Sequence, residues 1–189
     1  SIASVSKLRL ISSIGGNQGW SVEANGADML IALVPAPHPR GTTVEVCDLF
    51  FNVPARRKIL KTERTEFLKV EEVVRKISLS HPNVEVFLSH NGRQVRQYTG
   101  EEESDRVASV LGQAFLENAL FLVDEREGKE VRGWVGLPTY SRSQADQQYF
   151  FVNGRIVKDK VITHAVKQAY ADVLHHGRNP VYSLFLSIN

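Results

Sequence analysis

The stretch that decides the fold is residues 41–66, GTTVEVCDLFFNVPARRKILKTERTE. It opens on a small polar turn, Gly41-Thr42-Thr43, and continues through the β-branched Val44 and Val46, which are typical of a strand. Pro54 suits the first turn of a helix, because its missing N–H would have no intrahelical partner there. The stretch therefore predicts a polar turn, a strand and then a basic segment, whose cations are Arg56, Arg57, Lys58, Lys61 and Arg64.

The composition is that of an ordinary globular protein, with 189 residues, 42% hydrophobic, 23% charged and a formal net charge of +2. That charge is too small to indicate a nucleic-acid binder by itself, so any basic surface has to be local. The single cysteine, Cys47, excludes an internal disulfide framework and a cysteine-rich zinc site, and its strand-like setting predicts a small buried side chain. Without a membrane-spanning run or a signal-peptide pattern, the expected location is the cytoplasm, nucleoid-associated if the source is bacterial. The ends, with no initiator Met, indicate a piece of a longer protein.

The first part of the chain predicts antiparallel strands followed by a helix and a hairpin. Alternating patterns and turn signals predict strands over residues 7–12, 20–24, 29–34 and 42–48. A helix is predicted over 63–80, with Thr62 as its N-cap. Its expected core stripe is Phe67, Val70, Val74 and Ile77. Asn91-Gly92 then predicts a hairpin between residues 84–89 and 93–98.

Residues 99–106 carry no apolar side chain and predict a domain boundary, beyond which acidic residues are frequent. The second part predicts a helix over 107–115, a hairpin of 120–124 with 131–137, and strands over 149–152 and 181–188. A helix is expected over 159–176. Its buried face would comprise Ile162, Ala165, Val166, Ala169, Tyr170 and Val173. Strand, helix and strand in this order indicate a βαβ unit in an α+β domain.

Three groups of polar residues are candidates for function. Gly41-Thr42-Thr43 is either a simple turn before a strand or the hydroxyl floor of a ligand pocket. The basic run 56–64 is either a solvated helix surface or a phosphate-binding surface, and the same alternatives apply to the second basic group, Arg155, Lys158, Lys160, His164 and Lys167. Two such patches would form a groove if the domains face each other. The six histidines have no zinc-binding spacing, and no phosphate-loop or nucleophile motif is present, so the residues alone do not predict an enzyme.

At GTTVEVCDLFFNVPARRK (41–58) the sequence resembles the MutL family of DNA mismatch repair proteins. SIASVS (1–6) resembles the segment just after that family's Gly-Phe-Arg-Gly-Glu-Ala-Leu signature, and LSHNGR (88–93) and FVNGR (151–155) match in order and spacing. The resemblance implies part of the ATPase module of the superfamily of gyrase, Hsp90, histidine kinases and MutL (GHKL). The expected fold is an α/β sandwich, the C-terminal part of the ATP-binding domain, over residues 1–98. A domain like domain 2 of ribosomal protein S5 is expected over 104–189.

The resemblance also implies a function for the complete protein. Family members bind ATP with magnesium, form an ATP-dependent homodimer, and bind DNA without sequence specificity in a basic groove. They act with the mismatch-recognition protein MutS and with a downstream nuclease and helicase. By the resemblance, Thr42 joins the hydrogen-bond network around adenine, and the groove cations fall at Lys58, Lys61, Lys76, Arg132, Arg155 and Lys160.

The family's catalytic Glu, its magnesium-binding Asn and the Lys that reaches the γ-phosphate have no counterpart in these residues. Because hydrolysis needs a base and cations to hold the transferred phosphoryl group, we expect this chain alone neither to hydrolyse ATP nor to bind it tightly. Two alternatives stay open. One is a DNA- or partner-binding module without chemistry, and the other is a different member of the superfamily, such as a type II topoisomerase ATPase region.

Overall fold

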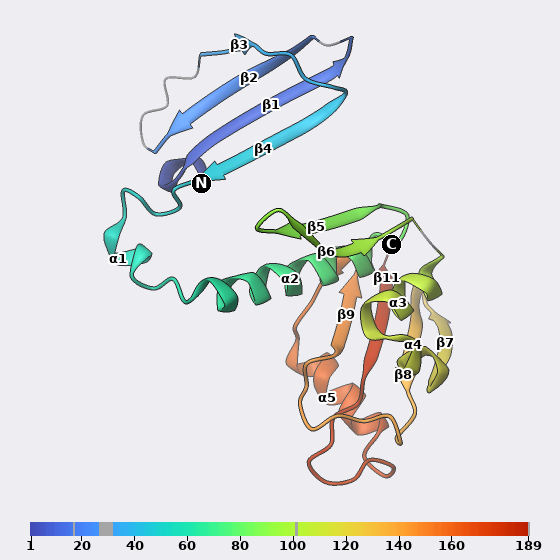
Figure 1. The fold of residues 1–189 in the computed structure, drawn as a ribbon. Coiled ribbons are helices and arrows are strands. Elements are labelled where there is room, and N and C mark those ends of the chain that lie inside the picture. The colour runs from blue at the N-terminus through green and yellow to red at the C-terminus, as the bar shows by residue number, and fades with distance from the viewer. Residues whose placement is uncertain (17, 27–31, 101, 189) are drawn as a thin grey trace. The chain divides into compact units, whose positions relative to one another are not determined.

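The computed structural model describes residues 1–16, 18–26, 32–100 and 102–188 (Figure 1). They form two compact units, Ser1–Glu66 and Phe67–Asn189. The predicted domain boundary near 99–106 therefore lies inside the second unit, and it stays a prediction. Within the described residues no helix is long and apolar enough to cross a membrane.

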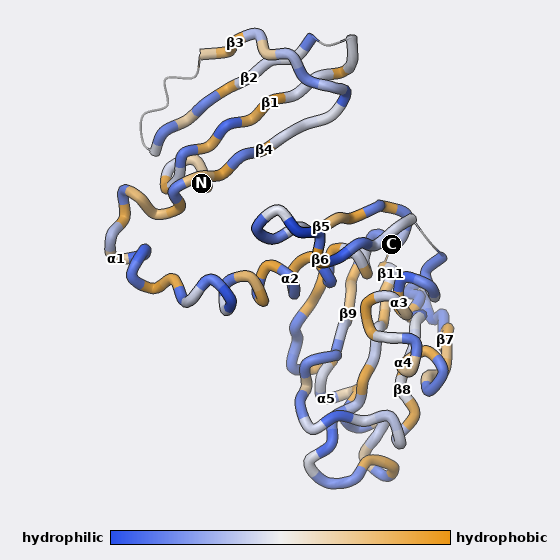
Figure 2. The backbone as a smooth tube through the Cα atoms, viewed as in Figure 1, coloured by the Kyte–Doolittle hydropathy of each residue, from blue (hydrophilic) through white to orange (hydrophobic). Residues whose placement is uncertain are grey.

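The first unit is built on an antiparallel sheet in the order β3-β2-β1-β4 (Figure 1). Its strands are β1 (Lys7–Gly15), β2 (Gln18–Asn25), β3 (Val34–Pro35) and β4 (Gly41–Cys47), preceded by the short 3₁₀ helix η1 (Ala3–Val5). Apolar and polar residues alternate along β1 (Figure 2), as in a strand with two unlike faces. The predictions for 7–12, 20–24 and 42–48 are confirmed, whereas most of the predicted strand 29–34 lies outside the described residues.

Cys47 is exposed, so the prediction of a buried thiol is wrong. It ends β4, which lies at an edge of the sheet, and nearly every residue of that strand is exposed. A β-branched pattern predicts a strand but does not say whether another layer covers it. After β4 the chain turns and enters the four-residue helix α1 (Pro54–Arg57), with Pro54 in its first turn as expected.

Helix α2 (Glu63–Ser80) has the predicted bounds, but its predicted buried stripe is wrong. The buried residues are Glu71, Ser78 and Leu79, whereas Val70 and Ile77 are about half exposed. A hairpin, β5 (Val86–His90) with β6 (Arg93–Tyr98), accounts for the burial of Glu71, because its Arg96 hydrogen-bonds to that carboxylate. Asn91 and Gly92 both have positive φ, as the predicted two-residue turn requires.

Glu71 links α2 to the hairpin. Its Oε1 accepts hydrogen bonds from Arg96 Nε at 2.6 Å and from Arg75 Nη2 at 3.1 Å. Burial acts to raise the pKa of Glu71, but the hydrogen bonds and charges of Arg96 and Arg75 outweigh it and lower the pKa below its usual 4.5. The ionised carboxylate is therefore the form that the fold stabilises.

We expect the stability of the protein to depend on the ionisation of Glu71. Because the folded-state pKa is lowered, this contribution is complete above pH 4.5 and is lost as the pH falls through the folded pKa. Urea unfolding from pH 7 to pH 3 should show a smaller loss of stability below pH 4.5 for Glu71→Gln than for the wild type. Glu127→Gln, which changes an exposed carboxylate, should follow the wild type, and identical curves for all three proteins would contradict this role.

The second unit contains a five-stranded sheet in the order β10-β9-β11-β8-β7 (Figure 1). Its strands are β7 (Ala119–Arg126), β8 (Lys129–Gly136), β9 (Gln148–Val152), β10 (Arg155–Ile156) and β11 (Tyr182–Ile188). The predicted βαβ unit is confirmed, since β9 and β11 pair in parallel across helix α5 (Lys160–Ala169). Glycine is required at position 133, where β8 pairs with β11, because a Cβ there would lie 2.1 Å from the Ser183 carbonyl oxygen.

Helices cover both faces of this sheet. On one face Leu79 of α2 packs with residues of α3 (Glu103–Leu111) and α4 (Gln113–Glu117) against aromatic residues of the strands. On the other face Ile162 and Val166 of α5 pack against Phe150, Tyr182 and Leu184. Strands β9 and β11 are thus covered on both faces, which explains their nearly continuous apolar sequence.

Two predicted helices differ from those observed. The helix expected over 107–115 is two helices, because Gly112 has a φ of 99° that ends α3. The helix expected over 159–176 ends at Ala169, and Val173 is exposed rather than buried. Ala165 and Ala169, also expected on the buried face, are exposed. The sequence predicted a longer helix because the turns after α5 also carry apolar residues at about the helical spacing.

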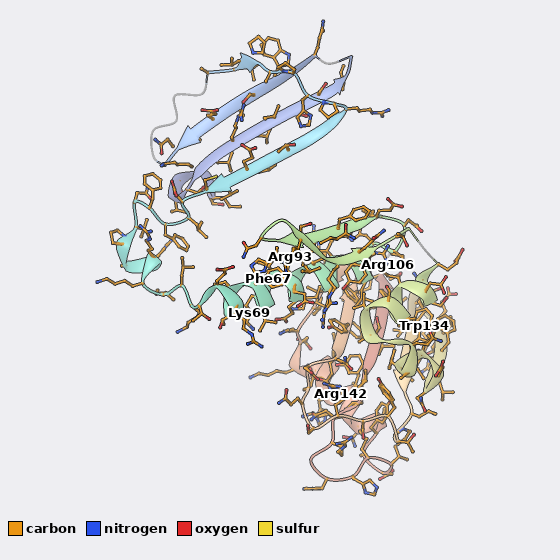
Figure 3. All side chains as sticks on the ribbon, viewed as in Figure 1. Phe67, Lys69, Arg93, Arg106, Trp134 and Arg142 are labelled. Carbon is orange, nitrogen blue, oxygen red and sulfur yellow. The ribbon has the colours of Figure 1, made fainter. Side chains whose placement is uncertain are left out.

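Arg106 is fully buried, although it lies in the stretch predicted as a polar boundary (Figure 3). Its Nη1 donates to the Ser78 carbonyl at 3.0 Å, and its Nη2 donates to the carbonyls of Pro82 (2.8 Å), Val84 (2.9 Å) and Thr99. The guanidinium lies 5.8 Å from the centre of the Tyr98 ring. One side chain therefore joins the end of α2, the start and end of the hairpin, and α3.

Candidate functional site

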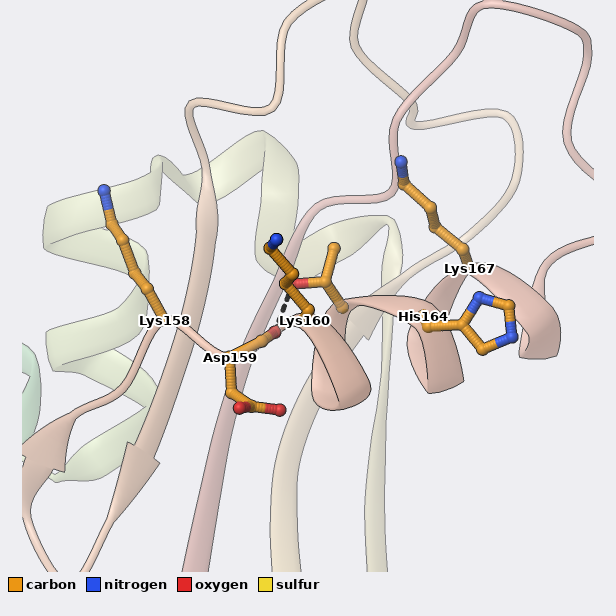
Figure 4. A pocket seen from close by; sticks show the side chains of 6 residues that line it. Lys158, Asp159, Lys160, His164 and Lys167 are labelled. Carbon is orange, nitrogen blue, oxygen red and sulfur yellow. Dashed lines mark hydrogen bonds between the residues drawn. The ribbon is translucent and has the colours of Figure 1, made fainter.

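The strongest concentration of positive charge around a described pocket is at the start of α5 (Figure 4). The pocket is open, has a volume of about 340 Å³, and is lined by Lys158, Asp159, Lys160, Thr163, His164 and Lys167. The one acidic group of this lining is Asp159. The three lysines are exposed and make no ion pair within the described parts of the chain.

Local structure explains why these cations gather. Asp159 is the N-cap of α5, since its Oδ1 accepts hydrogen bonds from the backbone N–H groups of Val161 (2.8 Å) and Ile162 (3.1 Å). The hydroxyl of Thr163 donates to the Asp159 carbonyl at 2.7 Å, as drawn in Figure 4. Because Ile162 and Val166 face the sheet, the lysines of the opposite helix face are directed outward.

The electrostatic character of this pocket suits a polyanion. Asp159 directs its carboxylate to the helix N-terminus, so it offsets the lysine charges only in part. The pKa of Glu72 is lowered mainly by a hydrogen bond from Lys76. The positive charges of Lys69 and Lys158 lower it further, so the charge of Lys158 acts beyond the pocket. Lysines at such positions act as point charges that hold phosphate and do not read bases.

The six predicted DNA-contacting residues fall into two groups. Four are exposed: Lys58 and Lys61 in the first unit, and Arg155 and Lys160 in the second. Arg155 lies in β10, just after the Asn153-Gly154 turn, and Lys160 begins α5 beside the pocket.

The other two predicted cations are already engaged by carboxylates. Lys76 donates to Glu72, and its side chain is only 18% exposed. Arg132 pairs with Glu103 and Glu130, and its guanidinium lies 5.6 Å from the Phe185 ring centre. Binding phosphate would require either side chain to give up these contacts. Their predicted role in DNA binding stays untested, and the geometry favours a structural role.

Lys158 and Lys167 belong to the pocket. The sequence placed both in the second basic group, but the resemblance did not include them among the groove cations. Their signal in the sequence was the spacing, because Lys167 follows Lys160 by seven residues, about two helical turns. Lys158 lies just before the helix, where periodicity gives no information. Its closeness in the chain nevertheless put it in the second basic group, and the structure has Asp159, the next residue, as the N-cap of α5.

Thr42 lies in β4 opposite Ser12 of β1. Its hydroxyl is 2.8 Å from the Ser12 hydroxyl, and the neighbouring Thr43 hydroxyl is 2.7 Å from His38 Nε2. Gly41-Thr42-Thr43 is therefore the start of the strand rather than a separate turn. Thr42 remains exposed, so its hydroxyl stays accessible for a further hydrogen bond. Among the described residues no cluster of histidine, cysteine or carboxylate groups has the arrangement of a metal site.

Comparison with known proteins agrees with this fold. The family model described as "DNA mismatch repair protein, C-terminal domain" matches residues 107–189. The "DNA mismatch repair protein MutL" of Cellvibrio japonicus is 52% identical over 194 residues, which is 100% of this chain and 31% of that protein. The same protein of Azotobacter vinelandii is 53% identical over 100% of this chain and 30% of its own length.

Comparison with solved structures leads to the same family. The "Aquifex aeolicus MutL ATPase domain complexed with ADP" superposes with a TM-score of 0.76 at 31% identity, covering 100% of this chain and 70% of that one. The B-subunit of DNA gyrase from Myxococcus xanthus, at 14% identity and a TM-score of 0.58, shares the fold; this chain is covered fully and that one to 58%.

The fold is thus that of the GHKL ATPases, a mixed α and β fold with several sheets, as the sequence predicted. The chain belongs to the MutL family of DNA mismatch repair proteins. It spans about 30% of the length of the curated relatives that it matches.

Proposed function

We propose that this chain is an internal segment of the N-terminal ATPase region of a mismatch repair protein, and that its α5 surface binds the phosphate backbone of DNA. The observation that supports this role is the group of three exposed lysines around one open pocket, with the only lining carboxylate bonded to the helix N-terminus. Binding of this kind depends on charge and not on sequence.

The nucleotide role belongs to the same proposal. The Aquifex relative is described as a complex with ADP, which supports nucleotide binding by the complete protein. We infer that Thr42 contributes a hydroxyl to the adenine network there, and that ATP binds with magnesium. The residues expected to activate water and hold the transferred phosphoryl group lie outside this chain, so coupling of ATP binding and hydrolysis to dimerisation is a property of the whole protein.

The proposed organisation and partners follow from family membership. Residues 1–98 would complete an ATP-binding domain, and residues 104–189 would form the S5-like, DNA-contacting domain. In the complete protein the partners would be DNA, a second copy bound in an ATP-dependent manner, MutS, and a downstream nuclease and helicase. The proposed location is the cytoplasm, close to the nucleoid.

Salt-dependent DNA binding by the 189-residue chain tests the phosphate-binding proposal. We expect the affinity for a labelled duplex to fall linearly on a log–log plot of binding constant against salt, with a slope of about −0.9 for each phosphate neutralised. Lys160→Ala should weaken binding to unrelated duplexes equally and reduce that slope by about 1. Lys129→Ala, at an exposed lysine of β8 that does not line the pocket, is the matched control. A slope near zero, or an equal effect of both variants, would contradict the proposal.

A further inference from the structure

Strand β7 forms one edge of the five-stranded sheet, and among the described residues only β8 pairs with it. The N–H of Leu137 donates to the Asn118 carbonyl at 2.7 Å, so these two residues form a hydrogen-bonded pair. Such pairs alternate along an antiparallel ladder. In the register of β7 with β8, Leu120, Leu122 and Asp124 therefore direct their backbone groups to β8. The backbone groups of Ala119, Phe121, Val123 and Glu125 point to the open side.

The edge strand is also apolar over its first half. Leu120 is 59% exposed, Phe121 is 54% exposed and Val123 is 56% exposed. Side chains alternate between the two faces of a strand, so Leu120 lies on one face, and Phe121 and Val123 lie on the other. Phe121 packs against Trp134 of β8, with ring centres 4.8 Å apart, which fixes its position at the edge (Trp134 is labelled in Figure 3).

An edge strand of this kind is unusual in a protein that remains monomeric, because edges are commonly blunted by charge, proline or a bulge. Here β7 and β8 pair over eight residues with no register shift. Apolar side chains on both faces favour an added strand over a surface docked on one face, since only a strand at the edge would extend both faces.

The charges around β7 indicate the chemistry of that strand. Its second half and the following turn carry exposed acids, Asp124, Glu125 and Glu127, and Glu117 precedes the strand. Arg126 is paired with Asp124 at 3.0 Å, which leaves Glu125 without a basic partner within the described residues. An incoming strand would therefore meet apolar side chains along one half and carboxylates along the other.

A second copy of this chain fits the edge less well. Antiparallel pairing of two β7 strands about Phe121 would overlap only residues 119–123, because α4 ends at Glu117, and the acidic second half of each strand would have no basic partner. Antiparallel pairing centred on Leu122 would place Leu120 of each copy opposite Asp124 of the other, an apolar side chain opposite a carboxylate. Neither register offers each copy an oppositely charged partner.

We propose that β7 is a docking edge for an extended segment of a partner protein, half apolar and half basic, which adds a sixth strand to the sheet. The backbone groups of Phe121 and Val123 hold its main chain, and the carboxylate of Glu125 selects its cations.

Labelled synthetic peptides about as long as β7, eight residues, test this docking with the 189-residue chain. One peptide has a lysine-rich N-terminal half and a valine-rich C-terminal half, and a second has the reverse order. At least one should bind by fluorescence anisotropy. Methylation of its alternate backbone amides, or replacement of its valines by serine, should weaken binding at least tenfold. Binding of neither order overturns the proposal, and so does equal binding of the serine peptide, which would show attraction by charge alone.

Variants of the protein locate the binding at β7. Val123→Pro removes an N–H that faces the open side and leaves the ladder to β8 intact, so it should weaken peptide binding at least tenfold. Val123→Lys should act similarly without altering the backbone. Val173→Lys, at an equally exposed valine, should bind as the wild type, with circular dichroism confirming that all variants fold. Unchanged binding by both Val123 variants overturns the proposal. Sedimentation that shows dimers of the chain, abolished by Val123→Lys, would assign the edge to a second copy and overturn it too.

Discussion

Replacement of Arg106 by methionine is expected to lower the free energy of unfolding by about 3–5 kcal/mol. The side chain is fully buried and donates to four backbone carbonyls, those of Ser78, Pro82, Val84 and Thr99. Methionine fills much of the volume but donates nothing, and a buried carbonyl without a partner costs about 1–3 kcal/mol. These acceptors belong to the backbone, so no substitution removes them together with the arginine.

Urea unfolding measures this effect, and Arg178→Met is the matched control. Arg178 also donates to a backbone carbonyl, that of Ser141, but it is exposed, so water can replace the lost donor. We expect the control to remain within about 1 kcal/mol of the wild type. Arg106→Lys should be intermediate, because one ammonium group cannot reach all four carbonyls. If Arg106→Met proved as stable as the control, water would have to satisfy these carbonyls, and the joining role of Arg106 would be wrong.

Reversal of Lys158, Lys160 and Lys167 to glutamate should abolish detectable binding of the chain to duplex DNA at moderate salt. Three lysines that neutralise phosphates account for about 0.9 each in the salt slope, and the new carboxylates add repulsion. We expect the affinity to fall by at least about a hundredfold at low salt, since each phosphate contact contributes roughly tenfold under those conditions. Electrophoretic mobility shifts or fluorescence anisotropy over a salt series would measure the loss.

A matched triple variant distinguishes the effect of the charges at the α5 pocket from the effect of the net charge of the chain. Glutamate at Arg93, Arg126 and Lys129 changes the net charge of the chain by the same amount, at exposed positions that do not line the pocket. We expect this control to weaken binding only modestly, because the potential that attracts DNA depends on where the charges lie. Equal losses in both triple variants would show that the α5 pocket has no special part in DNA binding.

The sequence predicted elements wherever a local rule is strict. Asn91-Gly92 predicted a hairpin because only residues that tolerate positive φ form that two-residue turn, and both have positive φ in the structure. Pro54 marked a helix start, and α2 has the predicted bounds. The run from β9 through α5 to β11 formed the predicted parallel pair.

The candidate site was predicted in part. Periodicity identified the polar face of α5 with Lys160, His164 and Lys167, because seven residues make about two turns. It gave no information on whether a cation is already paired. Lys76 and Arg132 look like free cations in the sequence, but each meets a carboxylate, Glu72 within α2 and Glu103 from α3 respectively.

The sequence by itself thus determined the order and type of most elements and the two basic stretches, because these depend on residues close together in the chain. The superfamily fold was implied by the resemblance to the MutL family. Only the tertiary structure decided which face of α2 is buried, that Arg106 lies inside, that Cys47 lies outside and that β7 has an open edge. Burial and pairing depend on segments that lie far apart in the sequence. The carbonyls that hold Arg106 come from residues 7 to 28 positions away, and no periodic pattern encodes that meeting.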